Sequence, residues 1–244
     1  MSIAMKANYD RLVVLDTETT GMNREGGPHY QGHNIIEIGA VEIINRKLTG
    51  RHFHAYIKPT RSIDPEAIEV HGITDAFLAD KPTYADVHQA FVSFVEGAEL
   101  IAHNAPFDVG FMDYEFKNLG VALKTSEICS ITDTLAMAKK IFPGKRNNLD
   151  ILCERYGIDN SRRTLHGALL DAEILADVYL LMTGGQTSLS FNAGTDTDNA
   201  SPMAPRSVKR QKPLKIIPAS ADELSAHEAR LDFIEQNGSC LWRQ

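Results

Sequence analysis

The feature that most constrains the fold is a short apolar run, Leu12–Leu15, that ends at two acids spaced two residues apart, Asp16 and Glu18. A run of this length is typical of a central strand that is buried on both faces. On a strand, side chains two residues apart point to the same face, so the two carboxylates are expected to lie side by side. Neighbouring carboxylates repel each other, and a divalent cation between them removes that cost.

The segments that follow predict an α/β domain. Ile35–Ile44 and His52–Lys58 are rich in strand-forming residues, and Leu100–His103 is another short strand. Helical patterns cover Pro82–Glu96, Asn104–Leu119, Thr134–Ile141, Leu149–Tyr156 and Gly167–Met182. Sequential strands followed by alternating helices and strands predict a mixed sheet flanked by helices.

One helix is expected to bury a stripe of four side chains, Val87, Ala90, Phe91 and Phe94. In the strand His52–Lys58, apolar residues alternate with polar ones, as on a half-buried strand.

The composition changes at residue 184, which divides the chain into a domain at 1–183, a linker at 184–213 and a tail at 214–244. The linker is rich in Gly, Ser, Thr, Asn, Asp and Pro and has little apolar periodicity, which predicts flexibility. In the tail, Ser220–Glu223 forms a capping box and predicts a helix to about Gln236.

The last residues of the tail, Cys240–Trp242, include the single tryptophan of the chain. A segment this short cannot bury a core of its own, so its apolar groups are expected to dock on another protein. The alternative is that the tail packs back on the main domain, which the long linker disfavours.

The net charge of −7 argues against a broad basic surface that holds nucleic acid by itself. An enzyme that grips a strand end through metal ions, supplied with substrate by a partner, remains compatible with this charge. The sequence contains neither a membrane-spanning apolar run nor a signal peptide, so we expect a cytoplasmic protein. Three widely spaced cysteines without a CxxC pair indicate neither a disulfide framework nor a zinc site.

Two further acids stand out. Asp108 falls in the first turn of the helix that Asn104 is expected to cap, where the helix dipole alone would explain an acid. Asp171 is in register with apolar residues three, four, seven and eleven positions later. A carboxylate in such a buried stripe is costly unless it is paired or binds a metal.

His166 lies five residues before Asp171, in the loop that leads into the last helix of the domain. A lone histidine there is usually structural or exposed, but beside a metal cluster it could act as a general base. Each signal is weak alone, and a solvated strand end is the favoured explanation of Asp16 and Glu18 when they are taken by themselves. Together, four acids and one histidine provide the groups for two-metal hydrolysis of a phosphodiester.

At these five residues the chain resembles the DEDDh exonucleases, over about the first three quarters of its length. The resemblance implies a ribonuclease-H-like fold with a five-stranded mixed sheet, and two divalent cations, Mg²⁺ with Mn²⁺ as a substitute. It implies that Asp16, Glu18 and Asp171 contact metal and substrate, that Asp108 acts partly through water, and that His166 deprotonates the attacking water.

Within these exonucleases, the chain is most similar to the proofreading ε subunits of bacterial DNA polymerase III. The resemblance rests on VLDTETTGMN, IIEIGAVEI, HNAPFDVGFMDYEF, FPGKRN, RTLHGALLDAEILADVYL and the ending GSCLWR. It implies that Glu66 and His71 contact the terminal nucleotide, although ordinary loop and cap roles would explain both residues equally well.

The family also implies partners. Residues 214–244 would bind the polymerase α subunit, and 186–191 resembles a sliding-clamp motif anchored by Gln186, Leu189 and Phe191. Some relatives bind a small θ subunit as well. A free-standing exoribonuclease with the same five residues, and a non-catalytic scaffold that joins clamp and polymerase, are the alternatives.

Overall fold

The computed structural model of the chain describes residues 11–161, 165–184, 218–238 and 240–243. The chain divides into two compact units, Met1–Ser190 and Phe191–Gln244. Gly184, where the linker was predicted to begin, is still the last residue of a helix, whereas the rest of the predicted linker, 185–213, and the clamp-like motif at 186–191 lie outside the described residues.

Five strands form one mixed sheet in the order β3-β2-β1-β4-β5. Their bounds are β1 Arg11–Thr19, β2 Ile35–Ile44, β3 Lys47–Tyr56, β4 Glu99–Ala102 and β5 Ser130–Asp133. Strand β2 pairs antiparallel with both β1 and β3, whereas β1, β4 and β5 run parallel. The predicted five-stranded mixed sheet with a buried central first strand is therefore confirmed.

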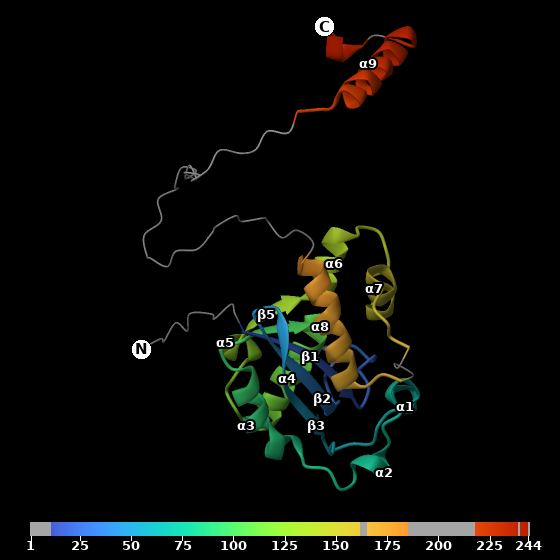
Figure 1. Cartoon of the computed structure of the whole chain (residues 1–244). Helices are drawn as coiled ribbons and strands as arrows, with labels where there is room; N and C mark the ends of the chain where they lie inside the picture. Colours follow the sequence, from blue (N-terminus) through green and yellow to red (C-terminus); the bar gives the residue numbers. More distant parts are fainter. Residues whose placement is uncertain (1–10, 162–164, 185–217, 239, 244) are drawn as a thin grey trace, which may run out of the picture. The chain divides into compact units, whose positions relative to one another are not determined.

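Helices cover both faces of this sheet (Figure 1). Their bounds are α1 Pro65–His71, α2 Asp75–Leu78, α3 Tyr84–Val95, α4 Ala105–Asn118, α5 Thr125–Ile128, α6 Thr134–Ile141, α7 Leu149–Tyr156 and α8 Ala168–Gly184. The helices expected at Thr134–Ile141 and Leu149–Tyr156 are confirmed residue for residue.

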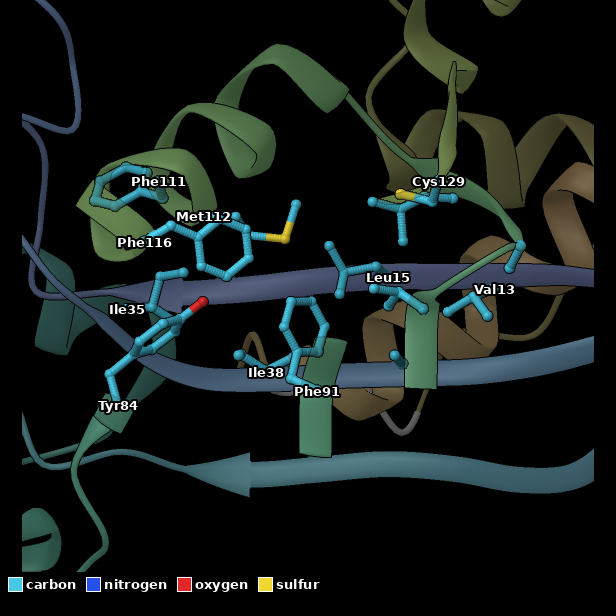
Figure 2. Close-up of a cluster of buried hydrophobic side chains, with 14 of the residues drawn as sticks. Val13, Leu15, Ile35, Ile38, Tyr84, Phe91, Phe111, Met112, Phe116 and Cys129 are labelled. Atoms are coloured by element: carbon cyan, nitrogen blue, oxygen red, sulfur yellow. The ribbon is translucent and has the colours of Figure 1, made fainter. Parts of the chain in front are cut away.

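The two faces of β1 pack against different helices, so its odd-numbered and even-numbered side chains belong to different clusters. Val13 and Leu15 belong to a core that α3 and α4 complete with Phe91, Phe111 and Phe116, as Figure 2 shows. The even-numbered residues face α8, whose Ala172, Leu175 and Ala176 pack on Val14. Asp16 and Glu18 continue this even series, so both acids lie on the face that α8 covers.

Helix α8 is buried on more than one stripe. Ile174 and Val178 pack against α6 and α7, while Leu175 and Ala176 pack against the sheet. The expected burial of Asp171 is confirmed. However, α8 packs between the sheet on one side and α6 and α7 on the other, so it does not have the single apolar stripe that was predicted.

Several local expectations were wrong. Ala90 is exposed on α3, since Val95 rather than Ala90 completes the buried face with Phe91. Asn104 occupies the N-cap position of α4, but it is left-handed, with φ 72°, and its side chain makes no capping hydrogen bond. Its backbone N–H instead donates to Asp133 Oδ1 at 3.0 Å, which fixes the start of α4 against β5.

The edge strands also differ from expectation for a physical reason. Strand β3 begins at Lys47, five residues before the predicted segment. The sequence did not reveal its first half, because that half is exposed on both faces and shows no alternation of apolar and polar residues. Strand β5 is a four-residue edge strand, SITD, that carries no apolar run, so its position was not predicted from the residues.

The carboxyl-terminal unit contains the expected helix, α9 Ala221–Gln236, with Ser220 and Glu223 in the predicted capping box. A short 3₁₀ turn, η1 Leu241–Arg243, follows. Arg243 contacts three carboxylates of α9, those of Glu228, Asp232 and Glu235, at 2.6–2.8 Å. Trp242 in this turn is 82% exposed.

No helix within the described ranges has both the length and the apolar character that crossing a lipid bilayer requires.

Candidate active site

The end of β1 meets the start of α8 at a cluster of three side chains. The ligand atoms of Glu18, His166 and Asp171 all lie within 4.8 Å of one another. Glu18 and Asp171 are buried, whereas the His166 side chain is 47% exposed and its Nδ1 lies 3.6 Å from Asp171 Oδ2. Residues from two distant stretches of the chain are thus brought together, with the imidazole on the open side.

The loop before α8 is tied to α1, which holds His166 in place. The His166 backbone N–H donates to Val70 O at 3.2 Å, and the Asp171 N–H donates to Gly167 O at 2.9 Å. His166 therefore precedes the helix, as predicted from its spacing, while Asp171 lies in its first turn.

Asp16 is half-buried on β1 and pairs in register with Gly39 of β2. A Cβ atom built on Gly39 would lie 2.1 Å from Leu169 N and 2.2 Å from Ala168 C. The absence of a side chain at Gly39 therefore lets the first turn of α8 rest directly on the sheet beside Asp16. Sequence reasoning missed Gly39, although a glycine inside a strand is the signal for such a close approach.

Asp108 approaches the strand from the other side. It is 3% exposed in the first turn of α4 and accepts a hydrogen bond from Thr17 Oγ1 at 2.7 Å. Thr17 lies between the two β1 acids in sequence, so α4 is fixed against the same strand end. Burial raises the pKa of Asp108 to about 7, and the Thr17 hydrogen bond offsets part of that rise.

A cleft of about 790 Å³ opens next to the cluster. It is lined by Glu18, by residues 21–25 after β1, by residues 64–67 of α1 and its cap, and by His71 and Phe107. Both candidate nucleotide contacts line it, but they differ in environment. Glu66 is exposed and pairs with Arg24, whereas His71 is 6% exposed and its Nδ1 accepts the Ile73 backbone N–H at 3.0 Å.

The cluster fits a divalent cation by its donor chemistry. Carboxylate oxygens are the ligands that Mg²⁺ and Mn²⁺ prefer, and two buried carboxylates within 4.8 Å would repel each other without a cation. Among the described residues, Glu18 and Asp171 are the acids whose ligand atoms gather within 4.8 Å together with that of His166.

His103, at the end of β4, makes stability dependent on pH. Burial lowers its pKa below the ordinary 6.5, and its Nδ1 lies 2.9 Å from Thr134 Oγ1. The unfolded chain takes up a proton near pH 6.5 that the folded chain resists, so this contribution to stability is present above that pH and is lost below it.

Replacing His103 with Gln removes this titration. We expect the stability deficit of the variant to shrink as the pH falls from about 7.5 to 5.5, by at most about 1.4 kcal/mol per pH unit. Urea unfolding of both proteins across this range measures the difference. A deficit that stays constant with pH would contradict a neutral, half-buried His103.

Residues 13–179 match the family described as Exonuclease. The DNA polymerase III subunit epsilon of Salmonella typhimurium is 58% identical over 243 residues, covering 98% of this chain and 100% of the relative. The subunits of Escherichia coli and Haemophilus influenzae are 58% and 56% identical over 98% and 96% of this chain, covering 100% and 95% of those relatives.

Solved exonuclease structures share the fold. Exonuclease X in complex with 5′ overhanging duplex DNA is 28% identical with a TM-score of 0.54, covering 72% of this chain and 94% of that structure. The nuclease domain of 3′hExo, a DEDDh family member bound to rAMP, is 19% identical with a TM-score of 0.58, covering 73% and 94%. These structures and the mixed sheet agree with the expected ribonuclease-H-like fold.

Identity above half over nearly the whole length, with the exonuclease domain intact, places the chain in the family of the DNA polymerase III epsilon subunits.

Proposed function

We propose that the protein hydrolyses the terminal phosphodiester of DNA in the 3′→5′ direction by a two-metal mechanism, with Asp16, Glu18, Asp108, His166 and Asp171 as its site. The chain is a 3′→5′ proofreading exonuclease of the bacterial replicative polymerase. The observation that carries the mechanism is the convergence of Glu18, His166 and Asp171 within 4.8 Å.

Exonucleases of this family use divalent metal ions, and Mg²⁺ is the ion we propose, with Mn²⁺ as a substitute. Asp16, Glu18 and Asp171 would hold the ions, and Asp108 would support them through water. Bound ions would polarise the scissile phosphate and lower the pKa of the attacking water. The chain's own part is to keep its carboxylates fixed on a rigid strand and helix.

His166 is the general base of this proposal. Its Nδ1 faces Asp171 at 3.6 Å, so a proton on Nδ1 is stabilised there and leaves the lone pair of Nε2 as the acceptor. The exposed ring can take a proton from water at the open side of the cluster and release it to solvent.

Glu66 and His71 are proposed to position the terminal nucleotide, since both line the cleft beside Glu18. The buried His71 would act by shaping the floor of the cleft, because its Nδ1 is engaged by the Ile73 N–H. Glu66 would act from the exposed rim.

The remaining proposals concern partners within the polymerase III core. Residues 214–244 would bind the polymerase α subunit, for which the exposed Trp242 on η1 is the described anchor. Gln186, Leu189 and Phe191 would bind the sliding clamp, and the exonuclease domain could carry a θ subunit. The protein would then act in the cytoplasm, at the bacterial replisome.

The acidic chain suits an enzyme that receives its strand end from the polymerase. We therefore expect a labelled single-stranded DNA to be shortened from its 3′ end with Mg²⁺ and to stay intact with EDTA. A mispaired terminus should be removed faster than a paired one, because it frays more readily. Gel analysis of 5′-labelled substrates resolves both results. A strong preference for RNA would favour the exoribonuclease alternative, and equal rates on both termini would count against proofreading.

A fragment that ends at residue 184, where α8 ends, should keep nuclease activity and lose the polymerase. All the described site residues precede this point, whereas the capped helix α9 and Trp242 follow it. Size-exclusion chromatography with the polymerase subunit compares fragment and full chain. Co-elution of the fragment would contradict the assignment of the tail.

A further inference from the structure

The loop between β1 and β2 is held in shape by hydrogen bonds that centre on Asn23. The Asn23 backbone N–H donates to His29 O at 2.8 Å, and its Nδ2 donates to Gly26 O at 2.7 Å. The Glu25 N–H donates back to Asn23 Oδ1 at 2.9 Å. Arg24 lies between two residues of this hydrogen-bonded turn, so its backbone is held in one place.

The same loop is anchored to α4 next to the active site. The ring of His29 stacks on that of Phe107 with centroids 4.9 Å apart and an interplanar angle of 15°. His29 Nε2 also lies 3.1 Å from Phe107 O, and Phe107 immediately precedes Asp108. The loop is therefore positioned relative to the site rather than free to move away from it.

Arg24 reaches from this loop to the opposite wall of the cleft. Its Nη1 lies 2.6 Å from Glu66 Oε2 on α1, and the two side chains are 66% and 69% exposed. Both residues line the cleft that contains the buried Glu18, so the ion pair lies on its outer rim. An exposed pair contributes at most about 1 kcal/mol, so a competing anion can replace Glu66 at little cost.

Among the described residues that line the cleft, the charges favour Arg24 for binding a phosphate. Glu18, Glu25 and Asp64 all line the cleft and repel an incoming phosphate. The other lining guanidinium, that of Arg61, is bound within the protein, to Asp64 Oδ1 at 2.6 Å and to Gly32 O at 3.0 Å. Arg24 thus provides a positive charge on the rim whose present partner is exposed and exchangeable.

We infer that Arg24 is a substrate-binding residue, which exchanges Glu66 for a phosphate of the DNA strand upstream of the scissile bond. The inference rests on the proposed exonuclease function. The exchange also frees the Glu66 carboxylate as the strand arrives, so that Glu66 can contact the terminal nucleotide. Arginine suits this task because its planar fork binds phosphate oxygens with charge-assisted hydrogen bonds.

A contact to a phosphate that does not react stabilises the bound substrate and the transition state equally. Its loss raises KM and leaves kcat unchanged. It also removes one phosphate contact from the salt dependence of binding, so the slope of log(kcat/KM) against log[salt] becomes less negative by about 0.7 for a single strand.

The test uses the full chain and two substrates, a single-stranded oligodeoxynucleotide and the 4-nitrophenyl ester of thymidine 5′-monophosphate. The ester contains the scissile phosphate and no other. Arg24→Ala should raise KM for the oligonucleotide about three- to tenfold, keep its kcat, and leave both constants for the ester unchanged. Arg24→Lys should restore most of the affinity, since it restores the charge.

Lys47→Ala is the matched control. Lys47 is exposed at the turn between β2 and β3, at the end of the sheet opposite to Glu18, and its loss changes the net charge equally. It should leave KM for the oligonucleotide unchanged. An unchanged KM in Arg24→Ala, or an equal rise for the ester, would overturn the inference. A wild-type chain that hydrolyses neither substrate with Mg²⁺ or Mn²⁺ would instead overturn the proposed function.

Discussion

Replacement of Asp171 with asparagine should lower kcat by at least about a thousandfold, a loss of about 4 kcal/mol of transition-state stabilisation. The side chain is 2% exposed and belongs to the cluster with Glu18 and His166. Asparagine keeps the shape of the residue but removes the charge that would hold a divalent cation. Asp16→Ala should abolish hydrolysis in the same way while complex formation with the polymerase persists, which separates the enzyme from a non-catalytic scaffold.

The Asp171→Asn variant should also lose the rise in Tm that a bound metal ion causes. At a Mn²⁺ concentration about a hundred times the dissociation constant, binding stabilises the folded wild type by about 2.7 kcal/mol. For a domain of this size, that corresponds to a rise in Tm of about 5–10 °C. Asp171→Asn should show little of this rise, and without metal it should be at least as stable as the wild type, because one repelling carboxylate is gone.

Asp177→Asn is the control for this experiment. Asp177 is an exposed acid on the same helix, so its replacement should leave both kcat and the metal-induced rise in Tm unchanged. If Asp171→Asn and Asp177→Asn behave alike, α8 contributes no metal ligand and the proposed mechanism is wrong.

Gly39→Ala is the second change with a large expected effect. The added methyl group would lie 2.1–2.4 Å from backbone atoms of Ala168 and Leu169, so α8 or β2 has to shift. Such overpacking costs about 1–3 kcal/mol, and displacing Asp171 by about 1 Å from the β1 acids should lower kcat about a hundredfold. Differential scanning calorimetry and the nuclease assay measure the two effects.

Gly167 provides the matched comparison for stability. It lies directly before α8, and a Cβ atom built there would meet no atom within 4 Å. Gly167→Ala should therefore keep a Tm close to that of the wild type. A Gly39→Ala protein with wild-type Tm and kcat would show that the contact between α8 and β2 does not position the site.

Elements with a strong apolar pattern were predictable from the sequence. The run before Asp16 identified the central strand, and the buried position of Asp171 followed from helical spacing alone. In contrast, β5 and the first half of β3 lack an apolar pattern because they are edge strands. Their existence depends on pairing with neighbouring strands, which no local pattern reports.

The site itself was predictable only as a list of residue types. Sequence spacing placed Asp16 and Glu18 on one face, but it did not reveal that Gly39 admits α8 or that Thr17 holds Asp108. The ion pair between Arg24 and Glu66 was also beyond reach, because it joins a loop and a helix that sequence patterns do not bring together. Such contacts between distant segments are set by packing rather than by propensity.

In the proposed mechanism, carboxylates from β1, α4 and α8 surround a pair of divalent cations, with His166 beside them. A crystal structure of the full chain with Mn²⁺ and thymidine 5′-monophosphate tests this directly, because an anomalous difference map locates the manganese ions. We expect two manganese peaks in contact with Asp16, Glu18 and Asp171. Peaks elsewhere, or a carboxylate of Asp16 or Asp108 that points away from them, would contradict it.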